Sequence, residues 1–407
     1  MTSPLSRRAF LTRSVLLGCS AAASPLLTPV SFAAAPWDTR LVVIILRGGM
    51  DGLDVIRPYG DPDLRLLRQN LSAGPEDGAT DLDGFYALHP ALDPLLPLWK
   101  SQQLAFVNAV STPYRDKRSH FDGQDLLEAG TNSLSGVRDG WLNRMLQQVP
   151  GVEARTAFAL GRGEMKLLVG DAPVADWSPN ADMSISPQAM RLAELVMEQD
   201  PAFHAAFTEA LMLSEDDPDG MALTGEEATA EMQMDMLQAG KGGAHVKIAE
   251  FAASQLRGDT RIAAFSLNGW DTHRRQDVGL SRALNRLATT ILTLKEALRG
   301  PVWNKTAIVA MTEFGRTARQ NGTKGTDHGT GGAMLLAGGA IRGGQVFGDW
   351  PGLSETALYE RRDLTPTSDV RSHAAWVMRG LTGLDRSVLE DTIFPGIQMG
   401  TDPGLLL

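Results

Sequence analysis

Residues 306–353 of this 407-residue chain read TAIVAMTEFGRTARQNGTKGTDHGTGGAMLLAGGAIRGGQVFGDWPGL. An apolar run ends at the acidic residue Glu313, and a Gly-, Thr- and Asn-rich loop then leads through Arg316 to Asp327 and His328 before a second apolar run begins. Enzymes of the α/β class place reactive groups in such loops, at the carboxyl ends of sheet strands. The stretch therefore predicts a strand, a loop that carries polar chemistry, and a second strand.

Three other apolar runs have the same organisation, at residues 41–46, 104–110 and 261–267. They show no polar alternation, which is typical of buried parallel strands. Because the carboxyl ends of parallel strands meet at one edge of a sheet, we expect the polar groups that follow them to form one site. These groups are Asp51 after the first run, Ser111, Ser119 and His120 after the second, and Asp271 and His273 after the third.

Asp271 and His273 are separated by one residue. In an extended segment or turn, alternate residues share a side, so the carboxylate and the imidazole are expected to lie together. This pair suits zinc or another divalent metal ion. A salt-linked turn is the alternative for this pair, and a turn or helix-capping acid is the alternative for Asp51.

Ser119 stands at the start of a predicted helix that Gly130 ends. Together with Asp122 three residues later, it has the form of a capping box, which explains a serine here without catalysis. A helix N-terminus also attracts anions. The second interpretation is therefore that the Ser119 hydroxyl, beside His120, attacks a phosphoryl or sulfuryl group.

Composition excludes some classes of protein. The formal net charge is −10, and no basic run or aromatic platform is present, which argues against nucleic-acid binding. No uninterrupted apolar run after the N-terminus approaches 18 residues, so no membrane span is expected. Residues 187–256 have Met and Leu at helical spacing and predict a helical insertion or lid on the sheet.

Residues 1–33 have the pattern of an export signal. Arg7 and Arg8 form a twin-arginine motif, an apolar stretch follows, and small residues near Ala33 suit cleavage. The remaining chain, residues 34–407, is expected to form one domain in the periplasm or outside the cell. The single cysteine, Cys19, lies inside this signal, where Leu17 fits a lipoprotein box poorly, so lipid anchoring is only the second interpretation.

Several segments resemble those of an exported bacterial family, domain of unknown function 1501, which is grouped with the alkaline phosphatase/sulfatase-like superfamily. They are RGGMDGLD, HPAL, STPYRDKRSHFDGQDLLEAG, FSLNGWDTH, MTEFGRTARQNGTKGTDHGTGGAMLLAGG and GGQVFGDWPGL. The resemblance implies an alkaline phosphatase-like three-layer α/β/α sandwich with a mostly parallel sheet. It also implies one or two bound metal ions and the hydrolysis or transfer of phosphate or sulfate esters.

The resemblance also implies residue roles. Asp51 is similar to the superfamily's first metal-binding aspartate, and Ser119 falls at its nucleophile position. Ser111 is the alternative nucleophile, because STPYR fits the Ser-x-Pro-x-Arg pattern of sulfatases. Either Glu313 or Asp327 takes the place of a later metal-binding aspartate. The predicted site is Ser119 as nucleophile, Asp51, Asp271, His273, Glu313, Asp327 and His328 as metal ligands, and His120 and Arg316 as contacts to the substrate anion.

The sequence thus predicts an exported metal-dependent hydrolase of small-molecule phosphate or sulfate esters. Zinc is the expected metal ion, with calcium or magnesium as alternatives. The rival hypothesis is a non-catalytic envelope or assembly protein that keeps the fold and the metal site. Hydrolysis assays on phosphate and sulfate esters distinguish the two.

Overall fold

The computed structural model describes residues 35, 37–71, 74–115, 118–134, 139–161, 165–178 and 243–407. All of them belong to one unit, Ala35–Leu407. The predicted export signal and residues 187–242 of the predicted helical insertion lie outside the described residues. None of the described helices combines the length and the apolar character that crossing a membrane requires.

The strand β1 (Arg40–Arg47) lies in the interior of the main sheet. It pairs in parallel with β8 (Ile262–Asn268) on one side and with β9 (Thr306–Met311) on the other. Its side chains are buried except at its last residue, as expected for a strand covered on both faces. The sheet order is β11 (Val346–Phe347), β5 (Leu104–Ser111), β10 (Gly332–Ala337), β9, β1, β8, β6 (Ala157–Leu160) and β7 (Ala175–Trp177), with β12 (Ser368–Asp369) paired to β5.

The strand β10 runs antiparallel to both of its neighbours, β5 and β9. The carboxyl ends of β5, β9, β1 and β8 therefore lie at one edge of the sheet. The segment that enters β10, which contains His328, starts at that same edge. The sequence predicted this strand but not its direction, and the direction is what brings His328 to the other polar loops.

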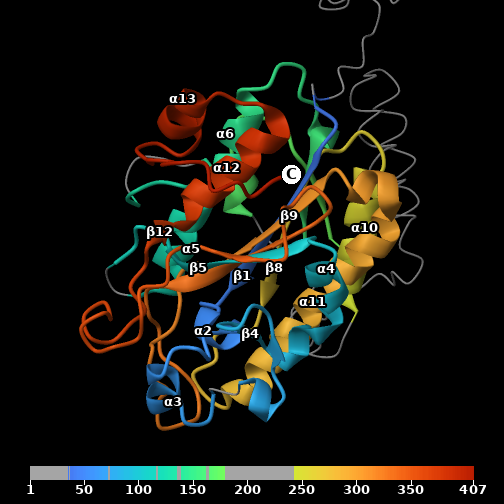
Figure 1. Cartoon of the computed structure of the whole chain (residues 1–407). Helices are drawn as coiled ribbons and strands as arrows, with labels where there is room; N and C mark the ends of the chain where they lie inside the picture. Colours follow the sequence, from blue (N-terminus) through green and yellow to red (C-terminus); the bar gives the residue numbers. More distant parts are fainter. Residues whose placement is uncertain are drawn as a thin grey trace, which may run out of the picture. The chain divides into compact units, whose positions relative to one another are not determined.

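Helices cover both faces of the sheet. Figure 1 shows α5 (His120–Ala129), α6 (Trp141–Gln147) and α12 (Val370–Thr382) on one side, and α4 (Leu96–Lys100), α10 (Ala244–Leu256) and α11 (Gln276–Trp303) on the other. On the first side α12 packs against β1 and β9, and on the second α10 and α11 pack together and against β8. The predicted α/β/α sandwich is confirmed.

Short elements complete the unit. A second sheet has the order β2 (Ile56–Arg57), β4 (Ala87–Leu88), β3 (Thr80–Asp81). The other helical segments of the described residues are α2 (Gly52–Val55), α3 (Asp63–Leu67), η2 (Pro75–Asp77), η3 (Pro90–Leu95), η4 (Ala154–Thr156), η5 (Lys166–Leu168), α13 (Arg386–Val388) and η6 (Leu389–Ile393).

Residues 166–168 form the short helix η5 and not a strand of the sheet. The backbone nitrogen of Leu167 donates to Glu128 Oε2 at 3.1 Å, and the Val169 carbonyl accepts from Gly140 at 2.8 Å. These bonds engage the backbone with α5 and α6 instead of with a strand. The edge position belongs to β7, which pairs with β6.

We expect the stability of this fold to fall as the pH is lowered from 6.5 to 4. Burial lowers the pKa of His373 on α12 to about 4, against about 6.5 in the unfolded chain. Between these values the unfolded chain binds a proton that the folded chain does not, so the free energy of unfolding decreases as pH falls. For His373 alone the loss reaches about 3 kcal/mol at pH 4.

Urea unfolding at pH 7 and pH 4.5 measures this effect. The variant His373→Gln keeps a polar group near Ser368 Oγ, which lies 2.9 Å from His373 Nε2, but does not titrate. Its stability is expected to depend less steeply on pH. Burial also lowers the pKa of His89 to about 4, so part of the dependence remains in the variant. An unchanged pH dependence of stability in His373→Gln would contradict the role of His373 in this dependence.

Candidate metal centre

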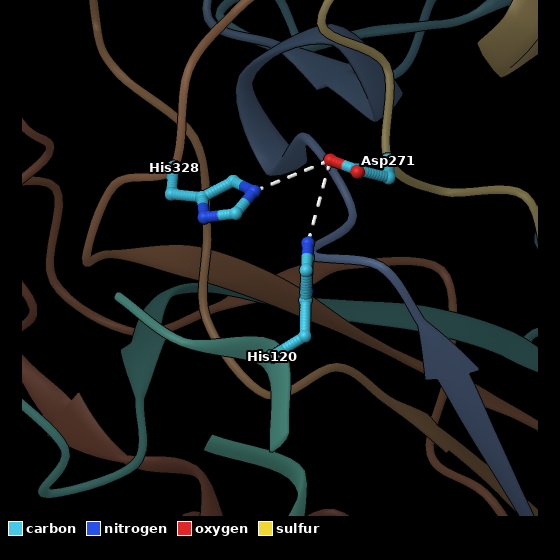
Figure 2. Close-up of side chains that lie close together, drawn as sticks. All are labelled: His120, Asp271 and His328. Atoms are coloured by element: carbon cyan, nitrogen blue, oxygen red, sulfur yellow. Dashed lines mark hydrogen bonds and ion pairs between the residues drawn. The ribbon is translucent and has the colours of Figure 1, made fainter. Parts of the chain in front are cut away.

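Three side chains from three separate segments meet at the carboxyl edge of the sheet. His120 is the first residue of α5, Asp271 follows β8, and His328 precedes β10. Their candidate ligand atoms all lie within 4.8 Å of one another. Asp271 Oδ1 is 3.4 Å from His120 Nε2 and 3.3 Å from His328 Nε2 (Figure 2). The sequence predicted Asp271 and His328 as metal ligands, whereas it placed His120 on the substrate.

His273 lies beside this group. Its Nε2 is 3.0 Å from Asp271 Oδ1 and 2.9 Å from His328 Nε2. The predicted proximity of Asp271 and His273 is therefore observed. The His273 side chain is 40 % exposed, which makes it the most accessible of the three imidazoles.

The outer nitrogen of each imidazole faces a hydrogen-bond acceptor. His120 Nδ1 is 2.7 Å from Glu313 Oε1, and His328 Nδ1 is 2.7 Å from the carbonyl oxygen of Arg118. An acceptor at Nδ1 holds the proton there, so the Nε2 lone pair points inward. A nitrogen that faces the Asp271 carboxylate at this distance needs a positive charge between them, which either a proton or a metal ion supplies. The arrangement is therefore the one that metal-binding histidines adopt.

Asp327 supplies the corresponding acceptor for His273. Its Oδ1 is 3.3 Å from His273 Nδ1 and also accepts from Asn321 Nδ2 at 3.0 Å. The hydrogen bond from Asn321, with that from His273, lowers the pKa of Asp327 below its usual value and keeps it charged. In this geometry Asp327 orients a histidine and does not itself join the group of candidate ligands.

The electrostatics of the centre also fit a bound cation. Burial alone would raise the pKa of Asp271, but His120, His328 and Arg316 outweigh burial and hold that pKa well below its usual range. The carboxylates of Asp271 and Glu313 raise the pKa of His120 to about 9. His120 Nε2 is buried, and its contact to Asp271 Oδ1 at 3.4 Å is an ion pair without hydrogen-bond geometry. Imidazole nitrogens with one carboxylate oxygen are a donor set that zinc accepts.

Glu313 is fully buried directly after β9, where the sequence placed it. Its Oε1 also accepts from the Gly48 nitrogen at 2.9 Å and from Gln124 Nε2 at 3.1 Å, and its Oε2 accepts from Thr312 Oγ1 at 3.0 Å. Both oxygens are therefore engaged. The geometry supports Glu313 as the group that orients His120 and does not support it as a direct ligand.

The structure does not bring Asp51 to the centre. Its two oxygens accept from the two terminal nitrogens of Arg68 at 2.7 and 3.0 Å, and Oδ2 also accepts from Gln276 Nε2 at 2.6 Å. Both Asp51 and Arg68 are buried. The position after β1 was predicted, but Arg68 occupies the place beside the carboxylate that a metal ion was expected to take.

Arg316 was predicted as a contact to the substrate anion, and in the structure its nitrogens face groups of the protein. Its Nε donates to the Gly49 carbonyl at 2.6 Å, and its terminal nitrogens donate to the carbonyls of Gly48, Trp270 and Thr326 and to Asp271 Oδ1. The side chain is buried. Because its three nitrogens are all engaged within the protein, Arg316 braces the loops and orients Asp271.

A protein-family comparison decides the classification. The family model described as "Protein of unknown function (DUF1501)" matches residues 108–393, which is more than half of the chain. The chain belongs to the DUF1501 family. The family resemblance expected from the sequence is confirmed, and the matched region of this DUF1501 protein contains His120, Asp271 and His328.

No curated protein matches this DUF1501 chain. Among solved structures it is similar to a protein in the alkaline phosphatase superfamily from Vibrio parahaemolyticus, with 10 % identity, a TM-score of 0.37 and coverage of 86 % of this chain and 68 % of that one. It is also similar to the lipoteichoic acid synthase LtaP from Listeria monocytogenes, with 10 % identity, a TM-score of 0.41 and coverage of 92 % and 77 %. These values are too low for the chemistry of those proteins to be transferred to this chain.

Ser119 is the N-cap of α5 in the DUF1501 protein. Its Oγ accepts from the Asp122 nitrogen at 3.4 Å, so the predicted capping contact is present. Both neighbours of Ser119 contact the centre, Arg118 through its carbonyl and His120 through its ring. Ser111 is buried at the end of β5, where its Oγ accepts from Arg115 at 3.2 Å. Ser119 is thus adjacent in sequence to two residues that contact the centre.

Two glycines allow the loops of the centre to pack on each other. Gly48 has φ +125°, and a Cβ there would lie 2.6 Å from the Asp271 nitrogen. A Cβ on Gly325 would lie 2.3 Å from the His273 carbonyl oxygen. At these two positions the absence of a side chain lets each loop approach the neighbouring loop closely.

Sequence reasoning missed Phe314 as part of the centre. Its buried ring lies with its centroid 5.1 Å from that of His120 and 5.0 Å from that of His328. It forms an apolar wall behind two imidazoles, which limits their rotation and strengthens the electrostatic interactions beside it. Nothing in a single sequence distinguishes this phenylalanine from an ordinary core residue.

Proposed function

We propose that this protein is an exported metal-dependent hydrolase of phosphate or sulfate esters. In this proposal His120, Asp271 and His328 hold one divalent ion, with zinc as the first choice, and His273 lies beside it. The observation that carries the proposal is the convergence of inward-facing Nε2 atoms on Asp271 Oδ1, including the buried His120 Nε2 without a hydrogen-bond partner among the described residues.

A bound zinc ion would act as a Lewis acid on an ester oxygen. The protein's own groups prepare the site for that step. Glu313 and the Arg118 carbonyl keep the His120 and His328 rings from turning. Arg316 holds Asp271 Oδ1 at 2.6 Å. Because these groups are already in position, the reorganisation energy is small when charge develops on the substrate.

A cavity of about 600 Å³ adjoins the centre at Asp327, which is one of its lining residues. Arg319, Arg361 and Arg362 also line it. Guanidinium groups bind phosphate, sulfate and carboxylate oxygens in a planar, two-pronged geometry. Three carboxylates, those of Asp63, Asp327 and Glu355, line the cavity as well, so its lining is of mixed charge and supports a polar substrate next to the metal centre.

The second candidate function is a non-catalytic metal-binding envelope or assembly protein. Two observations favour it. Arg316, the predicted anion contact, has its three nitrogens engaged within the protein, and Asp51, a predicted metal ligand, is paired with Arg68. A protein in which Arg316 binds no substrate anion and Asp51 binds no metal ion is still able to hold a structural metal ion without catalysing ester hydrolysis.

Metal analysis combined with an ester assay separates the candidates. The hydrolase is expected to contain one divalent ion per chain and to cleave 4-nitrophenyl phosphate or 4-nitrophenyl sulfate. Chelation should abolish the cleavage and zinc should restore it. One bound ion without cleavage of any phosphate or sulfate ester would support the envelope protein. A chain that binds no divalent ion would refute both.

We expect Ser119→Asn to lower kcat for the cleaved ester by about 1000-fold or more, because removal of a nucleophile has effects of at least this size. Asparagine still caps the helix, so the melting temperature should stay unchanged. Ser119→Thr keeps both the cap and a hydroxyl and is the matched control, with measurable activity expected. Full activity in Ser119→Asn would exclude Ser119 as nucleophile and direct the same test to Ser111→Ala.

A further inference from the structure

Gln276, the first residue of α11, is fully buried and uses both ends of its amide. Its Nε2 donates to Asp51 Oδ2 at 2.6 Å and to Asp54 Oδ2 at 2.8 Å. Its Oε1 accepts from Thr272 Oγ1 at 2.9 Å and from Thr326 Oγ1 at 2.6 Å. All the hydrogen bonds that this amide is able to make are thus made inside the protein.

The partners of Gln276 belong to three different segments of the site. Thr272 stands between Asp271 and His273, and Thr326 directly precedes Asp327 and His328. Asp51 and Asp54 lie at the exit of β1. One buried amide therefore joins the loop that follows β8, the loop that enters β10 and the segment that follows β1.

The chemistry of this position requires an amide. The carboxylates of Asp51 and Asp54 accept hydrogen bonds, and the two threonine hydroxyls donate to Oε1, so the orientation of the amide is determined. Asp51 also accepts two hydrogen bonds from Arg68. Glutamate would place a third carboxylate against two others, and methionine would leave two carboxylates and two hydroxyls without this partner.

We propose that Gln276 is a positioning residue of the metal centre, which holds the Asp271 and His328 loops at the separation that metal binding requires. This inference rests on the proposed metal binding. A backbone hydrogen bond from the Thr326 nitrogen to the Thr272 carbonyl, at 3.2 Å, keeps the two loops side by side. The Gln276 amide adds the link from both loops to the β1 segment.

The test compares the zinc affinity of the wild-type chain and of Gln276→Met, by competition with a chromophoric chelator. Loss of groups that orient metal ligands lowers metal affinity 10- to 100-fold, and we expect the Kd of Gln276→Met to rise by about 10-fold or more. The visible absorption of the Co²⁺-loaded protein, which reports on ligand geometry, should change as well. Thr326→Val removes one of the four hydrogen bonds and should show a smaller change in the same direction.

A control separates positioning from general destabilisation. Leu294→Ala removes a buried side chain from the same helix, 18 residues and about 27 Å further along. It should lower the melting temperature and leave the Kd and the Co²⁺ spectrum unchanged. If Gln276→Met does not fold, the nearly isosteric Thr272→Val and Thr326→Val decide the question, and unchanged Kd values in both would refute the inference.

The two proposals fail in different ways. If the wild type binds zinc, and Gln276→Met has the same Kd and the same Co²⁺ spectrum, the positioning role alone is overturned. A wild-type chain that binds no divalent ion overturns the metal centre and the positioning role together.

Discussion

His328→Ala is expected to raise the Kd for zinc by about 100-fold or more. The variant removes one of the three side chains whose ligand atoms meet within 4.8 Å and leaves His120 and Asp271 as the pair. Loss of a residue that only orients a ligand already lowers metal affinity 10- to 100-fold, so loss of a ligand should cost at least the upper end of that range. Metal content after dialysis and chelator competition measure the effect.

His245→Ala is the matched control for this prediction. His245 lies on α10, is partly buried as His328 is, and is not part of the candidate centre. Its replacement should leave the Kd for zinc unchanged. Equal losses in the two variants would show that the protein binds zinc at scattered histidines, and an unchanged Kd in His328→Ala would exclude this residue as a ligand.

Arg68→Ala is expected to lower the free energy of unfolding by about 3–5 kcal/mol, because it leaves the buried Asp51 carboxylate without its charged partner. Arg68 also donates to the carbonyls of Ala318 at 2.9 Å and Thr317 at 2.8 Å, and both would lose a hydrogen bond. Chemical denaturation of the wild type and the variant under identical conditions gives the difference.

Arg65→Ala provides the comparison, since Arg65 lies one turn earlier, is 57 % exposed and pairs with the exposed Glu76 and Asp77, the latter at 3.3 Å. Exposed pairs contribute little, and the change should stay within about 1 kcal/mol. The double variant Asp51→Asn/Arg68→Met removes both charges and should be more stable than Arg68→Ala. Similar losses for Arg65→Ala and Arg68→Ala would contradict the assignment of a buried ion pair.

The positions of Arg68 and His328 could be predicted from the sequence to different degrees. Asp271 and His328 follow or precede apolar runs, so their place at the sheet edge was readable from the local pattern. Arg68 lies in a polar loop, and no local signal connects it to Asp51, 17 residues earlier. Only the packing of the segment after α3 against the β1 exit brings the two together.

Glu313 and Arg316 show the limit of reasoning from residue type. A buried carboxylate after a strand suits both a metal ligand and the acceptor that orients a histidine, and the sequence favoured the first. The structure places donors from Gly48, His120 and Gln124 around Glu313 Oε1. Likewise, a guanidinium in a glycine-rich loop suits an anion, but carbonyls on all sides of Arg316 use its donors.

The sequence by itself determined the main strands β1, β5, β8, β9 and β10, the helix that begins after the Ser119 cap, and the loops that carry the chemistry. These features follow from short-range periodicity and from the conformational preferences of single residues. The tertiary structure decided the direction of β10, the partners of Asp51 and the role of each residue at the centre. Such contacts join residues up to 268 positions apart, as between Gly48 and Arg316, and depend on how distant segments pack.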